Sequence, residues 1–173
     1  VVRCAGRSAS LTAPNGQAQR DLLLAALANA GLDPISLARM EAHGTGTSLG
    51  DPVEAGSFSA VVLLERDVGS AVVGLGGVKA NIGHAEPAAG LTGLLKLANA
   101  LEACLSAPNA QLRVLNVHVE EALHGLSCAL PTQVAMAAGN TSPGGVSSFG
   151  YAGTIAHAVL RCGAVYSSPA SAS

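Results

Sequence analysis

Two histidines of this chain stand in glycine-rich loops, where small neighbours can hold an imidazole close to a ligand. His43 lies in EAHGTGTSLGDPVEAGS, residues 41–57, and His84 lies in VKANIGHAEPAAG, residues 78–90. A third segment rich in small residues, GVSSFGYAGTIAH, covers residues 145–157. Each segment taken alone has an ordinary explanation, since a lone histidine is often structural and glycines often only form turns. His43 by itself is compatible with a core residue, a metal ligand or a catalyst.

Metal and phosphate sites are poorly supported as explanations of these loops. Two histidines with no matching carboxylate or cysteine cluster form a poor metal-ligand set. A phosphate-binding loop would show a GxGxxG or Walker pattern, and neither is present. The four cysteines (Cys4, Cys104, Cys128 and Cys162) lack CxxC spacing, which argues against zinc and against a disulfide framework. We therefore predict no metal, no directly bound cofactor and reduced thiols in an intracellular protein.

The composition limits the classes of function that remain. The 173 residues are about one domain's length, and 49% of them are hydrophobic while only 12% are charged. A surface so poor in charge is expected to pack largely against another part of a protein. The net charge of -2, the absence of a basic run and the aromatic content of 2% argue against nucleic-acid binding.

The chain carries no recognisable membrane or export segment. Its longest apolar stretch, residues 88–101, is interrupted by polar residues and is too short to span a bilayer. The N-terminus lacks the charged and then apolar pattern of a signal peptide. We expect a cytoplasmic location. Because the sequence starts with VVRC and no initiator methionine, we also expect a piece of a longer chain.

Hydrophobic periodicity predicts strands and helices in alternation. Strands are expected at residues 1–4, 39–42, 71–78, 145–149 and 154–160, helices at 17–30, 51–63 and 87–105, and weaker strands near 115–119 and 133–136. The order β-α-β-α-β-α-β-β is typical of a layered α/β fold. Both histidine loops follow strands and precede helices, so they are expected at the carboxyl edge of the sheet, where α/β proteins place their sites.

Helix ends carry their own signals. Gly31 is predicted to end the first helix as a C-terminal cap. Asp51 is predicted to be the N-cap of the second helix, with Pro52 at its first position and Glu54 completing a capping box. The third helix is apolar around most of its circumference, so it should be buried on most sides.

Taken together and in this order, the segments resemble the C-terminal half of the β-ketoacyl synthases, in particular the ketosynthase domains of modular polyketide synthases. GRSASLTAPNG, residues 6–16, is similar to the family's GRSNGLTAPNG, and the three loop segments match three successive family motifs. The resemblance runs from residue 6 to residue 162 and is weakest over 106–143. It implies a thiolase-like half with a mixed five-stranded sheet and three helices. We predict a domain over 1–163 and a disordered tail or linker over 164–173.

The resemblance also implies roles for individual residues. His43 of HGTGT and His84 of NIGH correspond to the two catalytic histidines, and Lys79 to the family's lysine. Thr45 and Thr47 correspond to the pair that binds the phosphopantetheine arm of an acyl carrier protein.

The third motif corresponds to the family's gate beside the acyl-cysteine, with a backbone N–H of the oxyanion hole. Here it contributes Phe149, Gly150 and Tyr151, of which Tyr151 stands at the aromatic gate position. Phe149 is equally compatible with ordinary core packing.

The implied reaction is a decarboxylative Claisen condensation, in polyketide or fatty-acid synthesis. A malonyl thioester loses carbon dioxide, and the enolate attacks an acyl-cysteine thioester. Negative charge develops on a thioester oxygen, so two preorganised donors at that point should carry much of the rate. Neutral imidazoles can donate through Nε2–H. Lys79 is expected to orient His84 and bias the local charge, and not to abstract a proton.

The largest departure from the family is the missing nucleophile. The family's cysteine sits in a DTACSSS-type elbow, and no such stretch occurs here. A useful thiol nucleophile needs an activating setting such as a helix N-terminus, and none of the four cysteines has one in the predicted elements. We therefore expect this chain to be inactive alone and to need an N-terminal half that carries the cysteine. An acyl carrier protein is the second expected partner, and a homodimer is expected when the enzyme is complete.

A second hypothesis stays open from the sequence. The chain could be part of a catalytically inactive ketosynthase-like module that binds carrier protein or serves as a scaffold. Ile155 stands where the family's GTNAH motif has asparagine, which removes a hydrogen-bonding side chain and favours this alternative. The retained His43, His84 and Lys79 favour the enzyme.

Overall fold

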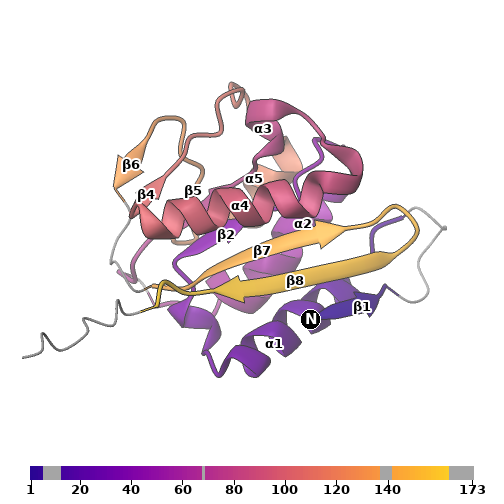
Figure 1. Ribbon diagram of the computed structural model, residues 1–173, viewed down its shortest axis with the longest axis horizontal. Coiled ribbons are helices and arrows are strands. Elements are labelled where there is room, and N and C mark those ends of the chain that lie inside the picture. The colour runs from indigo at the N-terminus through magenta and orange to yellow at the C-terminus, as the bar shows by residue number, and fades with distance from the viewer. Residues whose placement is uncertain (6–12, 68, 137–141, 164–173) are drawn as a thin grey trace, which may run out of the picture.

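A mixed β-sheet organises the chain in the computed structural model, which describes residues 1–5, 13–67, 69–136 and 142–163 (Figure 1). The strands are β1 (Val2–Cys4), β2 (Arg39–Glu41), β3 (Val73–Gly76), β4 (Leu105–Ser106), β5 (Cys128–Ala129), β6 (Ala135–Met136), β7 (Gly144–Phe149) and β8 (Thr154–Leu160). The α-helices are α1 (Gly16–Ala30), α2 (Gly50–Phe58), α3 (Lys79–Ile82), α4 (Ala89–Glu102) and α5 (Val117–Leu123). Shorter turns of helix lie at Pro34–Ser36, Ser59–Leu63 and Glu86–Ala88.

The order of strands in the sheet brings the two histidine loops to one edge. The order is β1-β8-β7-β2-β3-β5, and β2 pairs in parallel with both β3 and β7. Strands β7 and β8 form an antiparallel hairpin, and β1 pairs with β8 on the far side. Because β2 and β3 run in the same direction, the loops that follow them leave the sheet at the same edge. The predicted alternation and the mixed sheet are confirmed.

Two cores lie on the two faces of this sheet, because successive side chains of a strand point to opposite faces. Met40 of β2 belongs to the larger core, with helices α1, α2 and α5, whereas its neighbour Glu41 contacts α4. The larger core comprises Leu23, Leu27, Leu37, Met40, Ala55, Phe58, Val61, Val62, Leu63, Val73, Leu75, Val119 and Leu123. The smaller core comprises Leu97, Leu101 and Val146.

Helix α1 shows how local signals fix its ends. The Asn15 side chain accepts a hydrogen bond from the Ala18 N–H at 3.1 Å, which caps the helix. Gly31 adopts the left-handed conformation with φ of 63°, as predicted for a C-terminal cap. The predicted apolar face is buried through Leu27, whereas Ala30 at the last turn is exposed.

Helix α4 lies against β7 (Figure 1). A Cβ added at Gly90 would lie 2.8 Å from the Ser148 hydroxyl, so a larger residue there would force α4 or Ser148 to shift. The opposite face is uncovered: Leu91 and Leu95 are 58% and 54% exposed. The expectation that this helix is buried on most sides therefore fails within this chain, because the sheet covers only one of its faces.

The segment between α4 and β7 differs most from the prediction. The strand expected near residues 115–119 is wrong, because α5 occupies Val117–Leu123. The Asn116 side chain accepts from the His118 N–H at 2.9 Å and starts the helix. Val119 and Leu123, four residues apart, then pack into the larger core. A helical spacing was present in the sequence, but only two of its positions are deeply buried.

Three further details correct the sequence prediction. Among the described residues, the sheet has six strands instead of five, since β5 of the segment after α4 adds to its edge beside β3, and β4 and β6 form a separate pair. The expected loop KANIGHAE begins with a short helix, α3. With α5, the described part of the chain thus has two α-helices beyond the three predicted. Helix α4 ends at Glu102 instead of 105, since Cys104 has φ of 54° and Leu105 begins β4. The predicted tail, residues 164–173, lies outside the described residues.

Within the described residues, no helix is both long and apolar enough to cross a membrane. This result concerns the helices alone.

The bare face of α4 predicts self-association of the isolated 173-residue chain. Exposed leucines on one stripe favour association because burying them removes apolar surface from water. We expect sedimentation at tens of micromolar to show oligomers or aggregates, and the double variant Leu91→Glu, Leu95→Glu to shift the chain toward monomer. Leu24→Glu on α1, at a site 49% exposed, is the matched control and should change nothing. A monodisperse wild-type monomer would contradict this prediction.

Candidate active site

One hollow collects nearly all of the predicted site residues. It has a volume of about 800 Å³ and lies at the sheet edge where the loops after β2 and before α4 meet the β7–β8 turn. The predicted residues that line it are His43, Thr45, Thr47, His84, Phe149, Gly150 and Tyr151. Lys79 does not line it but contacts the loop behind His43. The three motifs, far apart in sequence, thus converge on one site.

The HGTGT loop is held by a buried carboxylate. Glu54 is 7% exposed and accepts hydrogen bonds from the backbone N–H groups of His43 at 2.7 Å and Gly44 at 2.9 Å. Gly44 and Gly46 have φ of 47° and 75°, the left-handed conformation that favours glycine. The loop therefore turns tightly around a fixed acceptor, and His43 is positioned through its own backbone.

The predicted capping box at α2 is wrong. The helix begins at Gly50, and the Thr47 hydroxyl accepts the Gly50 N–H at 3.1 Å in place of an Asp51 cap. Asp51 turns back instead, and its carboxylate accepts the Gly46 N–H at 3.1 Å. Both acidic residues are used to fix the loop, not to complete the first turn of the helix.

The two threonine hydroxyls stand next to each other at the mouth of the hollow. Thr45 Oγ1 and Thr47 Oγ1 are 3.2 Å apart. Thr45 is half-buried and Thr47 is exposed. Both threonines line the hollow.

The tautomer of His84 follows from a backbone contact. The Glu86 N–H donates to His84 Nδ1 at 2.8 Å. A neutral imidazole that accepts at Nδ1 carries its proton on Nε2. Gly83, with φ of 77°, turns the chain just before the ring. His84 is therefore preset to donate through Nε2–H.

His43 and His84 face each other across the hollow. Their ring centres are 5.8 Å apart and the planes are nearly perpendicular, at 87°. The Phe149 ring centre lies 5.4 Å from that of His43. Burial, with the positive charge of Lys79 as a second cause, lowers the pKa of His43 to about 4. His43 is thus neutral near pH 7.

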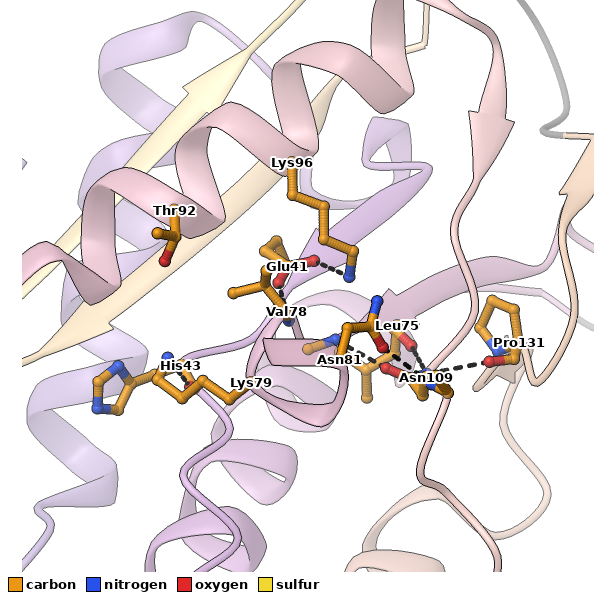
Figure 2. Close-up of polar contacts among 12 residues, drawn as sticks. Glu41, His43, Leu75, Val78, Lys79, Asn81, Thr92, Lys96, Asn109 and Pro131 are labelled. Carbon is orange, nitrogen blue, oxygen red and sulfur yellow. Dashed lines mark hydrogen bonds and ion pairs between the residues drawn. The ribbon is translucent and has the colours of Figure 1, made fainter. Parts of the chain in front are cut away.

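Lys79 sits on the His43 side of the site. Its ammonium group donates to the His43 backbone carbonyl, as Figure 2 shows. The structure adds a contact with the His43 loop to the predicted role of Lys79, and its orientation of His84 stays a prediction. Burial lowers the pKa of Lys79, while Glu54, Glu41 and Asp51 act in the opposite direction. Lys79 fixes the backbone of His43 and disfavours a positive charge on its ring.

The β7–β8 turn forms the third wall. Phe149 ends β7 half-buried beside His43, which places it in the hollow and not in either core. The Gly150 N–H donates to the Thr154 carbonyl at 2.6 Å, so this amide is used inside the turn. Tyr151 is 82% exposed at the tip. Ile155, where the family has asparagine, is buried and lines the hollow.

Two carboxylates that sequence reasoning left without a site role prove central. Glu54 was assigned to a helix cap, and Glu41 was treated only as part of a strand. Burial raises the pKa of Glu54 to about 7, while its hydrogen bonds from Gly44 and His43 act in the opposite direction. The signal for both was available in the sequence: acidic residues flank the loop in otherwise apolar surroundings.

None of the four cysteines is set up as a nucleophile beside the histidines. Cys4 of β1 is exposed and lines the same hollow, but it lies on an edge strand and not at a helix N-terminus. Burial raises the pKa of Cys128 to about 11, which disfavours its thiolate. Within the described residues, no group of three or more potential ligands is placed to hold a metal ion.

The neutrality of His43 can be measured directly. We expect its imidazole to titrate near pH 4, followed by the NMR shift of the ring protons. Lys79→Met should raise this midpoint because a nearby positive charge is removed. The midpoint should still stay below the ordinary 6.5, because burial is the larger cause. A wild-type midpoint close to 6.5, or no change in the variant, would contradict the assigned surroundings.

Comparison with known proteins gives the chain its family. The family model described as "Beta-ketoacyl synthase, C-terminal domain" matches residues 1–113. Mycoketide-CoA synthase of Mycobacterium tuberculosis is 39% identical over 156 residues, which are 90% of this chain and 4% of that protein. Spectinabilin polyketide synthase system protein NorA' of Streptomyces orinoci is 41% identical over 156 residues, with the same two coverages. The chain thus spans only a small part of these relatives.

Solved structures agree with this assignment. The oxazolomycin ketosynthase domain OzmH KS7 of Streptomyces albus JA3453 superposes with a TM-score of 0.84 at 33% identity, over 94% of this chain and 29% of that one. The ketosynthase from module 6 of the bacillaene synthase of Bacillus subtilis 168 gives 0.83 at 32% identity, over 92% and 29%. Fold, motif order and sequence identity point to the same relatives, and the chain belongs to the family of β-ketoacyl synthase C-terminal domains.

Proposed function

We propose that this chain is the histidine-bearing half of a β-ketoacyl synthase that catalyses decarboxylative Claisen condensation of acyl and malonyl-type thioesters. The observation that carries the proposal is the facing pair His43 and His84, 5.8 Å apart, with His84 fixed as an Nε2–H donor. The similarity to polyketide synthases supports polyketide synthesis as the setting, with fatty-acid synthesis as the related alternative.

The chemistry needs what this pair offers. Loss of carbon dioxide from a malonyl thioester leaves its electron pair on the carbon next to the thioester, and charge spreads onto the thioester oxygen. Two Nε2–H donors that converge on this oxygen stabilise the enolate. The enolate carbon then attacks the acyl thioester, and the cysteine thiolate leaves. A His43 that stays uncharged keeps its role as a hydrogen-bond donor without acting as a buried cation.

Substrate binding is assigned to the other walls of the hollow. Thr45 and Thr47 would accept and donate hydrogen bonds to the phosphopantetheine arm of an acyl carrier protein. Phe149 and Tyr151 would gate the acyl chain. The Gly150 N–H is already bonded inside the turn, so we assign Gly150 to shaping the gate. We assign the backbone N–H that would bind an acyl oxygen to Tyr151 instead.

The reaction also requires parts that this sequence does not contain. An N-terminal ketosynthase half would supply the cysteine nucleophile and cover the bare face of α4. The ketosynthase structures similar to this chain are more than three times its length, which leaves room for such a half. The complete enzyme is proposed to be a homodimer. Retention of His43 and His84 in one geometry favours this enzyme over an inactive binding module.

The histidine pair is tested in a ketosynthase domain that joins this chain to its N-terminal half. His43→Ala or His84→Ala should each lower malonyl decarboxylation on the order of 100- to 1000-fold, since each removes one preorganised donor. Decarboxylation is measured as release of labelled carbon dioxide from a malonyl thioester. His124→Ala, at an exposed position of the segment after α5, is the control and should leave the rate unchanged.

The isolated 173-residue chain is the negative control of the same experiment and should give no condensation product. Product from it that disappears when Cys4 is replaced would overturn the need for a second half. Variants of both histidines that keep a near wild-type rate would overturn the roles proposed for them.

A further inference from the structure

A single buried carboxylate lies between the two histidine loops. Glu41 is the last residue of β2, two residues before His43, and is 3% exposed. Its Oε2 lies 2.6 Å from the ammonium group of Lys96 on α4. Its Oε1 accepts the Val78 N–H at 2.5 Å, just after β3. Figure 2 shows Glu41 between these two partners.

The surrounding sequence leaves a slot for this ion pair. A Cβ added at Gly76 would lie 2.8 Å from Lys96 Nζ and 2.9 Å from Glu41 Oε2. A Cβ added at Gly93 of α4 would lie 3.5 Å from Glu41 Cγ. The glycines on β3 and α4 therefore face the pair, and a side chain at Gly76 would displace it.

The contacts of Glu41 reach both catalytic loops. On its own strand it leads directly into His43. Across the sheet it holds Val78, whose neighbour Lys79 donates to the His43 carbonyl and starts helix α3 toward His84. Through Lys96 it also anchors α4, which begins five residues after His84. One carboxylate thus joins β2, the segment after β3 and α4, which lead into or flank the two histidine loops.

A second set of hydrogen bonds holds the end of β3 but does not link the two histidine loops. The Asn109 side chain accepts the Gly77 N–H at 2.8 Å and donates to the Leu75 carbonyl at 3.1 Å (Figure 2). These bonds join β3 to the segment after α4. Of the contacts shown in Figure 2, those of the Glu41 carboxylate are the ones that link β2, the end of β3 and α4.

We propose that Glu41 is a positioning residue of the condensation chemistry, with Lys96 as its charge partner, and that together they set the separation of His43 and His84. This inference rests on the proposed function. Two donors stabilise one oxygen only when both are held close to the productive geometry, and a displacement of about 1 Å can cost 100-fold in rate. An ion pair that served stability alone would have no such effect on one step of the reaction.

The first test compares Glu41→Gln with the double variant Glu41→Gln, Lys96→Met in the complete ketosynthase domain. Glutamine can still accept the Val78 N–H, but its amide group then faces the ammonium group of Lys96. We expect E41Q to lower kcat for malonyl decarboxylation on the order of 10- to 100-fold, with little change in KM. Acylation of the nucleophilic cysteine, a step to which we assign no role of the histidine pair, should stay near the wild-type rate.

The double variant should stay at least as slow as E41Q, because it also lacks the ion pair that joins β2 to α4. Glu121→Gln, which breaks the exposed ion pair between Glu121 and His118, is the matched control and should change neither step. A parallel loss of decarboxylation and acylation in E41Q would overturn the proposal. A double variant that decarboxylates near the wild-type rate would also overturn it, since the defect of E41Q would then come from the unpaired charge of Lys96. If E41Q does not fold, the double variant decides: a loss of decarboxylation of about 10-fold or more with acylation near the wild-type rate supports positioning, and decarboxylation near the wild-type rate overturns it.

A second measurement separates this inference from the proposed function. The ¹⁵N and ring-proton NMR signals of His43 and His84 report their surroundings whether or not the enzyme decarboxylates malonyl thioesters. Both sets of signals should shift in E41Q and remain shifted in the double variant. Unchanged signals in E41Q would overturn the positioning role. A wild-type domain that fails to decarboxylate would overturn the proposed function alone.

Discussion

Backbone amides that leave a sheet ladder must find other acceptors when they are buried, and two carboxylates meet this need here. Glu54 accepts the N–H groups of His43 and Gly44, and Glu41 accepts that of Val78. Without these acceptors the loops after β2 and β3 would have no fixed path. The histidines are thus placed by their backbone, and the carboxylates that place them do not have to touch a substrate.

Burying ionisable groups at this site has an energetic cost for the folded state. Burial raises the pKa of Glu54 to about 7, so the native state favours its protonated form. Its contribution to stability is greatest below the unfolded pKa and is lost as the pH rises through 7. His43, with its pKa lowered to about 4, contributes in the opposite sense, since its stability is present above 6.5 and lost toward 4. The buried part of the site therefore trades stability for geometry.

The sequence predicted the strands and long helices that carry the site, because their periodicity and end signals are local. It also named His43, His84 and the turn at Phe149 on resemblance, and the structure brings them together. The contact of Lys79 with the His43 carbonyl was not predicted, since it depends on how β3 and β2 lie side by side. Helix α5 was missed because tertiary burial of two positions outweighed a weak strand propensity. Contacts between segments far apart in the sequence, such as that of Glu41 on β2 with Lys96 on α4, leave no local pattern in the sequence.

The central claim is that two imidazoles donate to one developing oxyanion. It is tested most directly by titrating a non-hydrolysable malonyl-thioester analogue into the complete, ¹⁵N-histidine-labelled ketosynthase domain. The Nε2 signals of His43 and His84 are followed together. The account predicts that both signals shift with a single midpoint, because both rings bind the same oxygen atom. A shift of only one ring, or two separate midpoints, would contradict it.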